Sequence, residues 1–189
     1  MQVRDESLTW SEHSRSKVGS CSLFEMYSSE RSSAQGKTGR FCIITAHDWV
    51  NVVPVVREAG GETFLMVRQY RHGASLVTTE FPAGLIEPGE QPADAAAREL
   101  EEETGYRAGR LTSLGRISPN PAFMTNWCYT FLAEDLTRVG AQDLDELEEV
   151  AVLPVPAADL ARTIGTGELV NSLTLVAYFL YRRHRAGDA

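Results

Sequence analysis

Strand-like runs rich in hydrophobic residues along the middle of the chain predict a sheet. Residues 48–58 and 62–71 each have the pattern of a strand, and Ala59-Gly60-Gly61 between them is typical of a hairpin turn. Further strand-like runs cover residues 77–82, 111–117, 127–133 and 150–155. Strands dominate and helices are interspersed among them, which indicates an α/β sandwich.

Helical spacing marks residues 91–104 and two segments near the C-terminus. Pro92 suits a first helical turn and Gly105 suits a left-handed C-cap, so this helix has a clear start and end. Spacings of three and four predict one face that packs on the sheet, formed by Ala93, Ala96, Ala97, Leu100 and Thr104. A short helix is expected to end near Gly165, and a longer one to cover residues 168–185.

The N-terminal part has a different character. Residues 1–20 are rich in Ser, Arg, Glu and Asp and predict a mobile start or a short strand. Residues 21–27 and 40–46 alternate enough to form a β-hairpin. We therefore expect an N-terminal extension at residues 1–46 and a main domain at residues 47–189. A small hairpin buries little surface alone, so it would pack on the main domain or on a second subunit.

Composition narrows the classes of function. The chain has 189 residues, of which 43% are hydrophobic and 23% charged, and this supports a packed core. Its net charge of −8 disfavours nucleic acid as a partner, because the sequence offers no basic stripe. Neither a signal peptide nor a nonpolar run of the ~18 residues needed to span a membrane is apparent. Three cysteines without metal-binding spacing suit a reducing compartment, so we expect a cytoplasmic protein with no membrane partner.

An unusual acidic face lies on the helix predicted at residues 91–104. Glu99, Glu102 and Glu103 fall three and four residues apart, so they share one side. A like-charged pair at this spacing costs roughly 0.2–0.5 kcal/mol, and the negative end of the helix dipole adds to the repulsion. Such crowding is expected where a cation binds, and Mg²⁺ takes oxygen ligands from carboxylates and phosphates. The alternative is a solvated acidic surface.

The segment around these glutamates resembles the signature of the Nudix hydrolase family. Gly84, five residues, Glu90 and seven residues precede Arg98-Glu99-Leu100-x-Glu102-Glu103-x-Gly105-Tyr106, so every fixed position of the Nudix box is present. The resemblance implies an α/β/α sandwich with a mixed sheet, here with a small N-terminal β extension. It also implies an enzyme that hydrolyses a diphosphate linking a nucleoside to another group, with Mg²⁺ as the cofactor and Mn²⁺ as a substitute.

The same resemblance implies roles for individual residues. The metal ligands would be one backbone carbonyl and three side chains: Ala83, Glu99, Glu102 and Glu103. Glu103 is also counted as catalytic, as is Arg98, which would orient the carboxylates in a pair with Glu90. ADP-ribose pyrophosphatases of the family use a distant glutamate as the base, and the best alignment gives Glu146, with Glu148 as a ligand or alternative base. Alternatively, this acidic stretch is only a solvated loop.

Segments outside the box resemble the ADP-ribose and ADP-sugar pyrophosphatase branch of the family. They include residues 67–71, the run Glu80-Phe81-Pro82-Ala83-Gly84, and residues 132–136. The substrate-binding residues expected on this basis are Arg68, Arg71, Glu80, Pro121, Phe123 and Trp10. Arg71 has two interpretations, as a fork for ribose or phosphate oxygens and as a structural partner of Glu80. Trp10 either anchors local packing or, in a dimer, stacks on a base in the partner's site.

The predicted activity is hydrolysis of ADP-ribose or a related nucleoside diphosphate sugar to a nucleoside monophosphate and a sugar phosphate. One departure leaves the substrate open, because Asn120-Pro121-Ala122 replaces the Ser-Pro-Gly form common in the branch. The alternatives are another nucleoside diphosphate derivative, such as a GDP-sugar, FAD or a dinucleoside polyphosphate, and a nucleotide-sensing module without catalysis. By analogy with the branch, the N-terminal strands also predict a homodimer.

Overall fold

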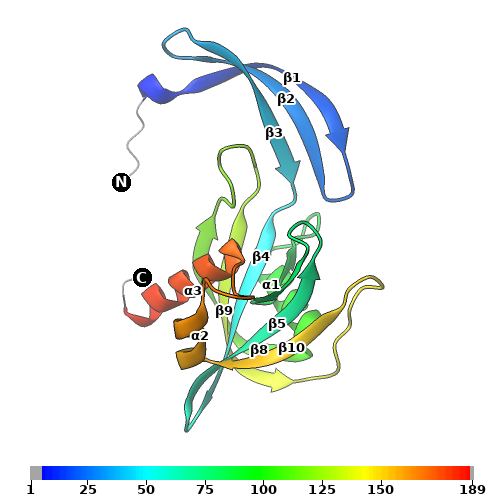
Figure 1. Ribbon diagram of the computed structural model, residues 1–189, viewed down its shortest axis with the longest axis vertical. Helices are drawn as coiled ribbons and strands as arrows, with labels where there is room; N and C mark the ends of the chain where they lie inside the picture. Colours follow the sequence, from blue (N-terminus) through cyan, green and yellow to red (C-terminus); the bar gives the residue numbers. More distant parts are fainter. Residues whose placement is uncertain (1–5, 188–189) are drawn as a thin grey trace. The chain divides into compact units, whose positions relative to one another are not determined.

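The computed structural model describes residues 6–187, which fold into two compact units (Figure 1). The smaller unit contains the residues up to His47 together with residues 118–127. The larger unit contains residues 48–117 and the chain from residue 128 onward. Each unit therefore has its own internal packing.

The larger unit is built on one mixed sheet. Its strands are β4 (Trp49–Glu58), β5 (Gly61–Arg71), β6 (Leu76–Glu80), β7 (Ala83–Leu85), β8 (Tyr106–Ile117), β9 (Cys128–Arg138) and β10 (Val150–Pro156). They lie in the order β10–β5–β4–β9–β8, with β6 beside β5 and β7 beside β4. β4 and β9 are parallel, whereas the other pairs are antiparallel.

Helices cover both faces of this sheet. They are α1 (Pro92–Thr104), α2 (Ala157–Thr163) and α3 (Ser172–Arg185). Successive side chains of β4 point to opposite faces, so Val50 and Val52 join the buried cluster that contains Leu100 of α1. Val53 and Val55 join the other cluster, with the buried residues of α2 and α3. The predicted α/β/α sandwich with a mixed sheet is thereby confirmed (Figure 1).

Helix α1 begins and ends as predicted but buries a different face. Pro92 lies in the first turn, and Gly105 forms a left-handed C-cap with φ of 73°. The predicted packing face was partly wrong, because Ala93 and Ala97 are exposed. The residues that are buried are Ala95, Ala96, Leu100, Glu103 and Thr104. The physical reason is that the carboxyl group of Glu103 is bonded inside the protein, so the buried side of the helix includes it.

The smaller unit is an antiparallel sheet in the order β1–β2–β3. Its strands are β1 (Trp10–Ser20), β2 (Phe24–Ser33) and β3 (Thr38–Ala46), and a short 3-10 helix (Glu6–Leu8) precedes them. β2 and β3 form the predicted hairpin. Of the two expectations for this segment, a mobile start or a short strand, the structure shows a strand at residues 10–20, which is longer than expected and pairs with β2 over nearly its whole length. Residues 1–5 of that expectation lie outside the described residues.

Two contacts complete the smaller unit. The rings of Trp10 and Phe41 meet edge to face, with centroids 5.2 Å apart. The backbone N–H of Ile44 in β3 donates to the carbonyl oxygen of Phe123 at 2.7 Å, which fastens residues 118–127 to the edge of the sheet. Trp10 therefore packs against Phe41 within its own unit, as the first of its two interpretations expects.

The last helix begins later than predicted. It starts at Ser172 because Gly165 and Gly167 take positive φ values of 86° and 55° and keep the preceding segment in turns. Asn171 then caps the helix, since its side-chain oxygen accepts the N–H of Leu173 at 2.8 Å. No helix within residues 6–187 is long and nonpolar enough to cross a membrane.

Candidate active site

Arg98 joins the loop before α1 to the acidic face of the helix. Its guanidinium donates to both carboxylate oxygens of Glu90, from Nε at 3.0 Å and from Nη2 at 3.1 Å. Nη1 donates to Glu99 and to Glu102, each at 2.9 Å, and Nη2 also donates to the carbonyl oxygen of Leu85 at 2.9 Å. Hydrogen bonding, to Glu90 above all, raises the pKa of Arg98 further above its usual range. One cation thus holds three carboxylates in place.

Glu103 points into the larger unit, with only 4% of its surface exposed. Its Oε2 accepts the backbone N–H of Ala83 at 3.0 Å, which ties α1 to the first residue of β7. Burial raises the pKa of Glu103 to about 8; the Ala83 N–H opposes this rise, and the charges of Glu99 and Glu148 add to it. A buried carboxyl group with acidic neighbours requires either a proton or a cation.

Glu99 lies directly against the backbone of Gly84. A Cβ atom at position 84 would stand 2.0 Å from Oε1 of Glu99, which is closer than real Cβ atoms come. A side chain at position 84 would displace the Glu99 carboxylate from its place, whereas the backbone angle at Gly84 is not unusual. Burial also raises the pKa of Glu99, although the hydrogen bond and the charge of Arg98 oppose it.

The chemistry of this acidic face fits a divalent cation. Glu99 and Glu103 both lose solvation by burial, both are raised in pKa, and oxygen donors of this kind are the ligands that Mg²⁺ prefers. Within residues 6–187, no three Asp, Glu, His or Cys side chains converge as a metal cage. The hydrogen bonds explain this, because Arg98 engages Glu99 and Glu102 while the Ala83 N–H engages Glu103. A bound cation would compete with these donors for the same oxygens.

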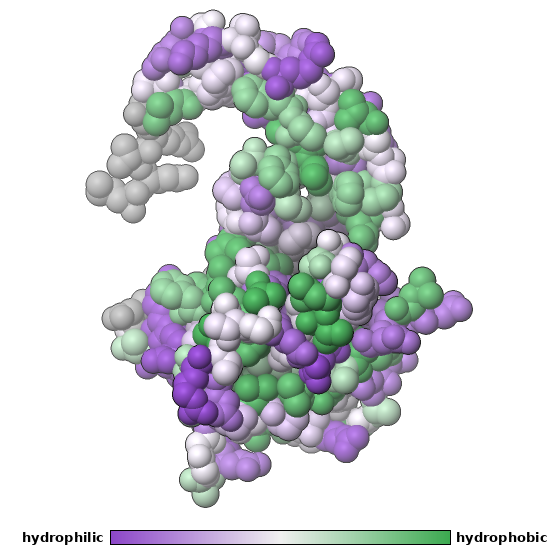
Figure 2. Space-filling view, viewed as in Figure 1, coloured by the Kyte–Doolittle hydropathy of each residue, from purple (hydrophilic) through white to green (hydrophobic). Residues whose placement is uncertain are grey.

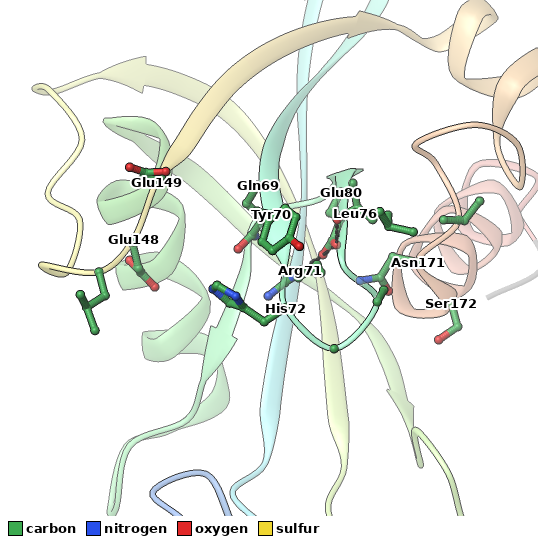
Figure 3. A pocket seen from close by; sticks show the side chains of 15 residues that line it. Gln69, Tyr70, Arg71, His72, Leu76, Glu80, Glu148, Glu149, Asn171 and Ser172 are labelled. Atoms are coloured by element: carbon green, nitrogen blue, oxygen red, sulfur yellow. Dashed lines mark hydrogen bonds and ion pairs between the residues drawn. The ribbon is translucent and has the colours of Figure 1, made fainter.

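A pocket of about 830 Å³ opens in the larger unit (Figure 3). Three stretches far apart in sequence line it, namely residues between 69 and 80 at the β5–β6 turn, residues 147–149 and residues 170–172. Three of the predicted site residues meet here: Arg71, Glu80 and Glu148. The pocket lies close to the acidic face of α1, because the charge of Glu148 acts on the carboxyl groups of Glu99 and Glu103.

Arg71 and Glu80 form a two-pronged ion pair in the pocket wall. Nε and Nη2 of Arg71 donate to the two carboxylate oxygens of Glu80 at 3.0 and 2.7 Å. Glu80 is only 2% exposed and also accepts a hydrogen bond from the side chain of Thr78, and the side chain of Asn171 further favours its ionised form. Burial opposes ionisation of Glu80, but these hydrogen bonds and the charge of Arg71 outweigh it and lower the pKa of Glu80. Arg71 therefore forms the structural pair with Glu80 and also lines the pocket, so the structure shows features of both interpretations of this residue.

The other predicted site residues lie outside this pocket lining, among them the five of the box region: Ala83, Arg98, Glu99, Glu102 and Glu103. Glu146 is exposed, and among the two candidate bases only Glu148 lines the pocket. Arg68 is paired with Glu168, with Nη2 at 2.7 Å from Oε1, and does not line the pocket. The remaining three belong to the smaller unit: Trp10, Pro121 and Phe123. Their role in substrate binding stays a prediction.

Tyr70, His72 and Asn171 are among the pocket residues that were not predicted as site residues. The rings of Tyr70 and His72 meet edge to face, with centroids 5.1 Å apart. Both flank Arg71 at the end of a strand, and that position was a usable signal. Asn171 is of a residue type that often caps helices, but the sequence does not show that this cap lies beside the β5–β6 turn.

The buried Glu103 predicts how stability changes with pH when no divalent cation is present. The carboxyl group has a pKa of about 8 in the folded protein against 4.5 in the unfolded chain, so the folded state binds the extra proton between these values. Stability conferred by the proton is complete below pH 4.5 and is lost as the pH rises through 8. In EDTA, we expect the melting temperature of the native protein to fall when the pH is raised from 6 to 8.5. This fall should be about 5 °C larger than the fall in Glu103→Gln over the same pH range. Equal pH profiles in calorimetry would contradict the prediction.

Comparison with known proteins agrees with this architecture. The chain matches the model of the NUDIX domain over residues 47–171. The ADP-ribose pyrophosphatase of Bacillus subtilis (strain 168) is 32% identical over 164 residues, which cover 86% of this chain and 87% of the relative. The ADP compounds hydrolase NudE of Escherichia coli (strain K12) is 29% identical over 144 residues, covering 76% of this chain and 75% of the relative. A crystal structure of an ADP compounds hydrolase superposes with a TM-score of 0.85 at 26% identity and covers 97% of this chain and 98% of its own. The chain belongs to the NUDIX family.

Proposed function

We propose that this protein hydrolyses the pyrophosphate bond of ADP-ribose or a related nucleoside diphosphate sugar, giving a nucleoside monophosphate and a sugar phosphate. The observation that carries the proposal is the acidic face of α1, whose buried Glu103 feels the charges of Arg71 and Glu148 from the pocket lining. The activities named for the two relatives, ADP-ribose pyrophosphatase and ADP compounds hydrolase, support the same class of substrate. We include dependence on Mg²⁺, with Mn²⁺ as a substitute, in the proposal.

The residues proposed to hold the cation are the carbonyl oxygen of Ala83 and the carboxylates of Glu99, Glu102 and Glu103. When bound, the cation supplies neutralisation of phosphate charge and a water of lowered pKa. Arg98 keeps both hydrogen bonds to Glu90 even if Glu99 and Glu102 turn away from it, because those bonds use different nitrogens. Arg98 therefore acts as a fixed support for carboxylates that change partner.

Glu148 is the proposed base, in preference to Glu146, because it lines the pocket and its charge acts on Glu99 and Glu103. In the reaction, water adds to one phosphorus and its proton passes to Glu148. The bond from that phosphorus to the bridging oxygen breaks, and the departing phosphate keeps the electron pair. Arg71, held from behind by Glu80, would donate hydrogen bonds to phosphate oxygens.

We further propose that the protein is a cytoplasmic homodimer that pairs through the smaller unit. Figure 2 shows hydrophobic side chains gathered on one side of the three-stranded sheet. Large nonpolar residues exposed in this unit include Leu8, Trp10, Val18, Leu23, Phe24 and Phe41. Contiguous nonpolar surface of this kind is typical of interaction sites, and a second copy offers an equivalent surface.

Activity measurements on two glutamates of the same helix test the proposed reaction. Glu101 pairs with Arg107 on the surface at 2.9 Å, whereas Glu103 is buried beside Ala83. With Mg²⁺, we expect the native protein to release AMP from ADP-ribose, Glu101→Gln to match it, and Glu103→Gln to lose at least ~100-fold in kcat. Chromatography of the products gives the rates, and EDTA serves as the blank. Absence of AMP with the native protein, or full activity in Glu103→Gln, would refute the proposal.

The choice of base is tested by comparing two neighbouring substitutions. Loss of a general base lowers kcat by about 10²- to 10⁴-fold, so we expect that loss in Glu148→Gln and a change below about threefold in Glu146→Gln. The reverse order of the two variants would restore Glu146 as the base.

The oligomeric state is measured by light scattering after size exclusion. We expect a mass close to twice the 20.8 kDa of one chain. Charges placed in the exposed nonpolar surface, as Val18→Asp with Leu23→Asp, should produce monomers. Phe179→Asp, at an equally exposed nonpolar residue of α3, should leave the mass unchanged. A monomeric native protein would contradict the dimer.

A further inference from the structure

The lining of the pocket indicates which half of the substrate it receives, an inference that rests on the proposed function. We propose that the pocket binds the sugar half of a nucleoside diphosphate sugar and selects an uncharged sugar over a phosphorylated sugar or a second nucleoside. Tyr70 and His72 are the residues we assign to this selection. Figure 3 shows both rings at the pocket, with Glu148 on one side and Asn171 and Ser172 of the α3 terminus on the other.

The charges that line the pocket disfavour an anionic group on the sugar. Among the lining residues, Arg71 is the single lysine or arginine, and the carboxylate of Glu80 balances its charge at 2.7 Å. Glu148 and Glu149 also line the pocket, so its remaining formal charge is negative. A further phosphate would therefore enter among like charges with no unpaired guanidinium to receive it.

The geometry of the aromatic pair disfavours a nucleobase. Bases are commonly held by stacking against the flat face of an aromatic ring, and a second parallel ring completes a slot. The planes of Tyr70 and His72 instead cross at 80°, so the pair forms a corner rather than a slot. Tyr70 is 49% exposed, and its electron-rich face suits the C–H groups of a puckered sugar ring.

Unused hydrogen-bonding groups in the lining suit hydroxyl groups. Within residues 6–187, the side chains of Gln69, His72 and Ser172 line the pocket and make no hydrogen bond. Together they offer both donors and acceptors to the hydroxyl groups of a sugar. The turn after His72 is fixed by the carbonyl oxygen of Arg71, which accepts the N–H of Ser75 at 2.8 Å, so the imidazole projects from an ordered backbone.

Two variants and four substrates test this assignment. The substrates are ADP-ribose, ADP-ribose with an additional phosphate on its terminal ribose, diadenosine diphosphate, and the methyl ester of ADP, which lacks a second sugar. The variants are His72→Ala and Tyr70→Leu, and His184→Ala on α3 is the matched control because His184 does not line the pocket. Melting curves establish that each variant is folded.

We expect kcat/KM of the native protein to be at least ~10-fold higher for ADP-ribose than for the other three substrates, since losing hydroxyl contacts or adding like charge weakens binding by that order. His72→Ala and Tyr70→Leu should each lower kcat/KM for ADP-ribose about 10-fold and change it less than about twofold for the methyl ester. His184→Ala should change neither value. Equal use of the phosphorylated sugar or the dinucleotide would overturn the proposal, as would an equal loss on all substrates.

A binding measurement tests the sugar preference separately from the hydrolysis reaction. Calorimetric titration in EDTA, where no turnover occurs, should give at least ~10-fold tighter binding of ADP-ribose than of the methyl ester, and His72→Ala should abolish the difference. If the native protein hydrolyses none of the four substrates, the proposed function fails while the titration still decides the sugar preference. Equal affinities for ADP-ribose and the methyl ester would refute the sugar pocket whether or not hydrolysis is observed.

Discussion

Concentrated negative charge on α1 is the constraint on which the larger unit depends. Three glutamates on one side of a helix repel one another, and burial of Glu103 increases the cost of that charge. The surrounding structure responds with a guanidinium that bonds two of them, a backbone N–H that bonds the third, and a glycine that leaves room for Glu99. Arg98 also bonds the carbonyl oxygen of Leu85 before α1, and the bond between Glu103 and Ala83 fixes β7 against the helix.

The same construction occurs twice at the site. Arg98 is anchored by both oxygens of Glu90, and Arg71 is anchored by both oxygens of Glu80. In each case a glutamate holds the planar guanidinium from one side, so its orientation is set before any ligand arrives. Arg98 then directs its remaining donor to the acidic helix, whereas Arg71 lines the pocket. Preorganised arginines of this kind lose little conformational freedom when they meet phosphate.

Local sequence signals predicted much of the fold and the centre of the site. Pro92 and Gly105 marked the ends of α1, and the spacing of the box identified Arg98 as the partner of Glu90. Hydrophobic runs located the central strands, and residues 50–55 of β4 and 64–67 of β5 are buried without a break because helices cover both faces of the sheet. The family assignment and the α/β/α architecture followed from these signals.

What sequence did not predict depends on contacts between distant segments. The rotation of α1 follows from the bond between Glu103 and Ala83, which are 20 residues apart. β1 has little hydrophobic alternation and forms a strand because β2 pairs with it. The pocket joins the β5–β6 turn to residues near 148 and 171. The sequence therefore could not show that Tyr70, His72 and Asn171 line one pocket.

The cap of α3 has a consequence for where a working fragment of this protein can be cut. The match to the family model stops at residue 171, which is the residue that caps the helix and also lines the pocket beside Glu80. A recombinant piece trimmed to the limits of that match would keep the acidic helix but lose the helix that holds Asn171 in position. The minimal unit for expression therefore extends through Arg185, and the terminal helix is a working part of the site's framework.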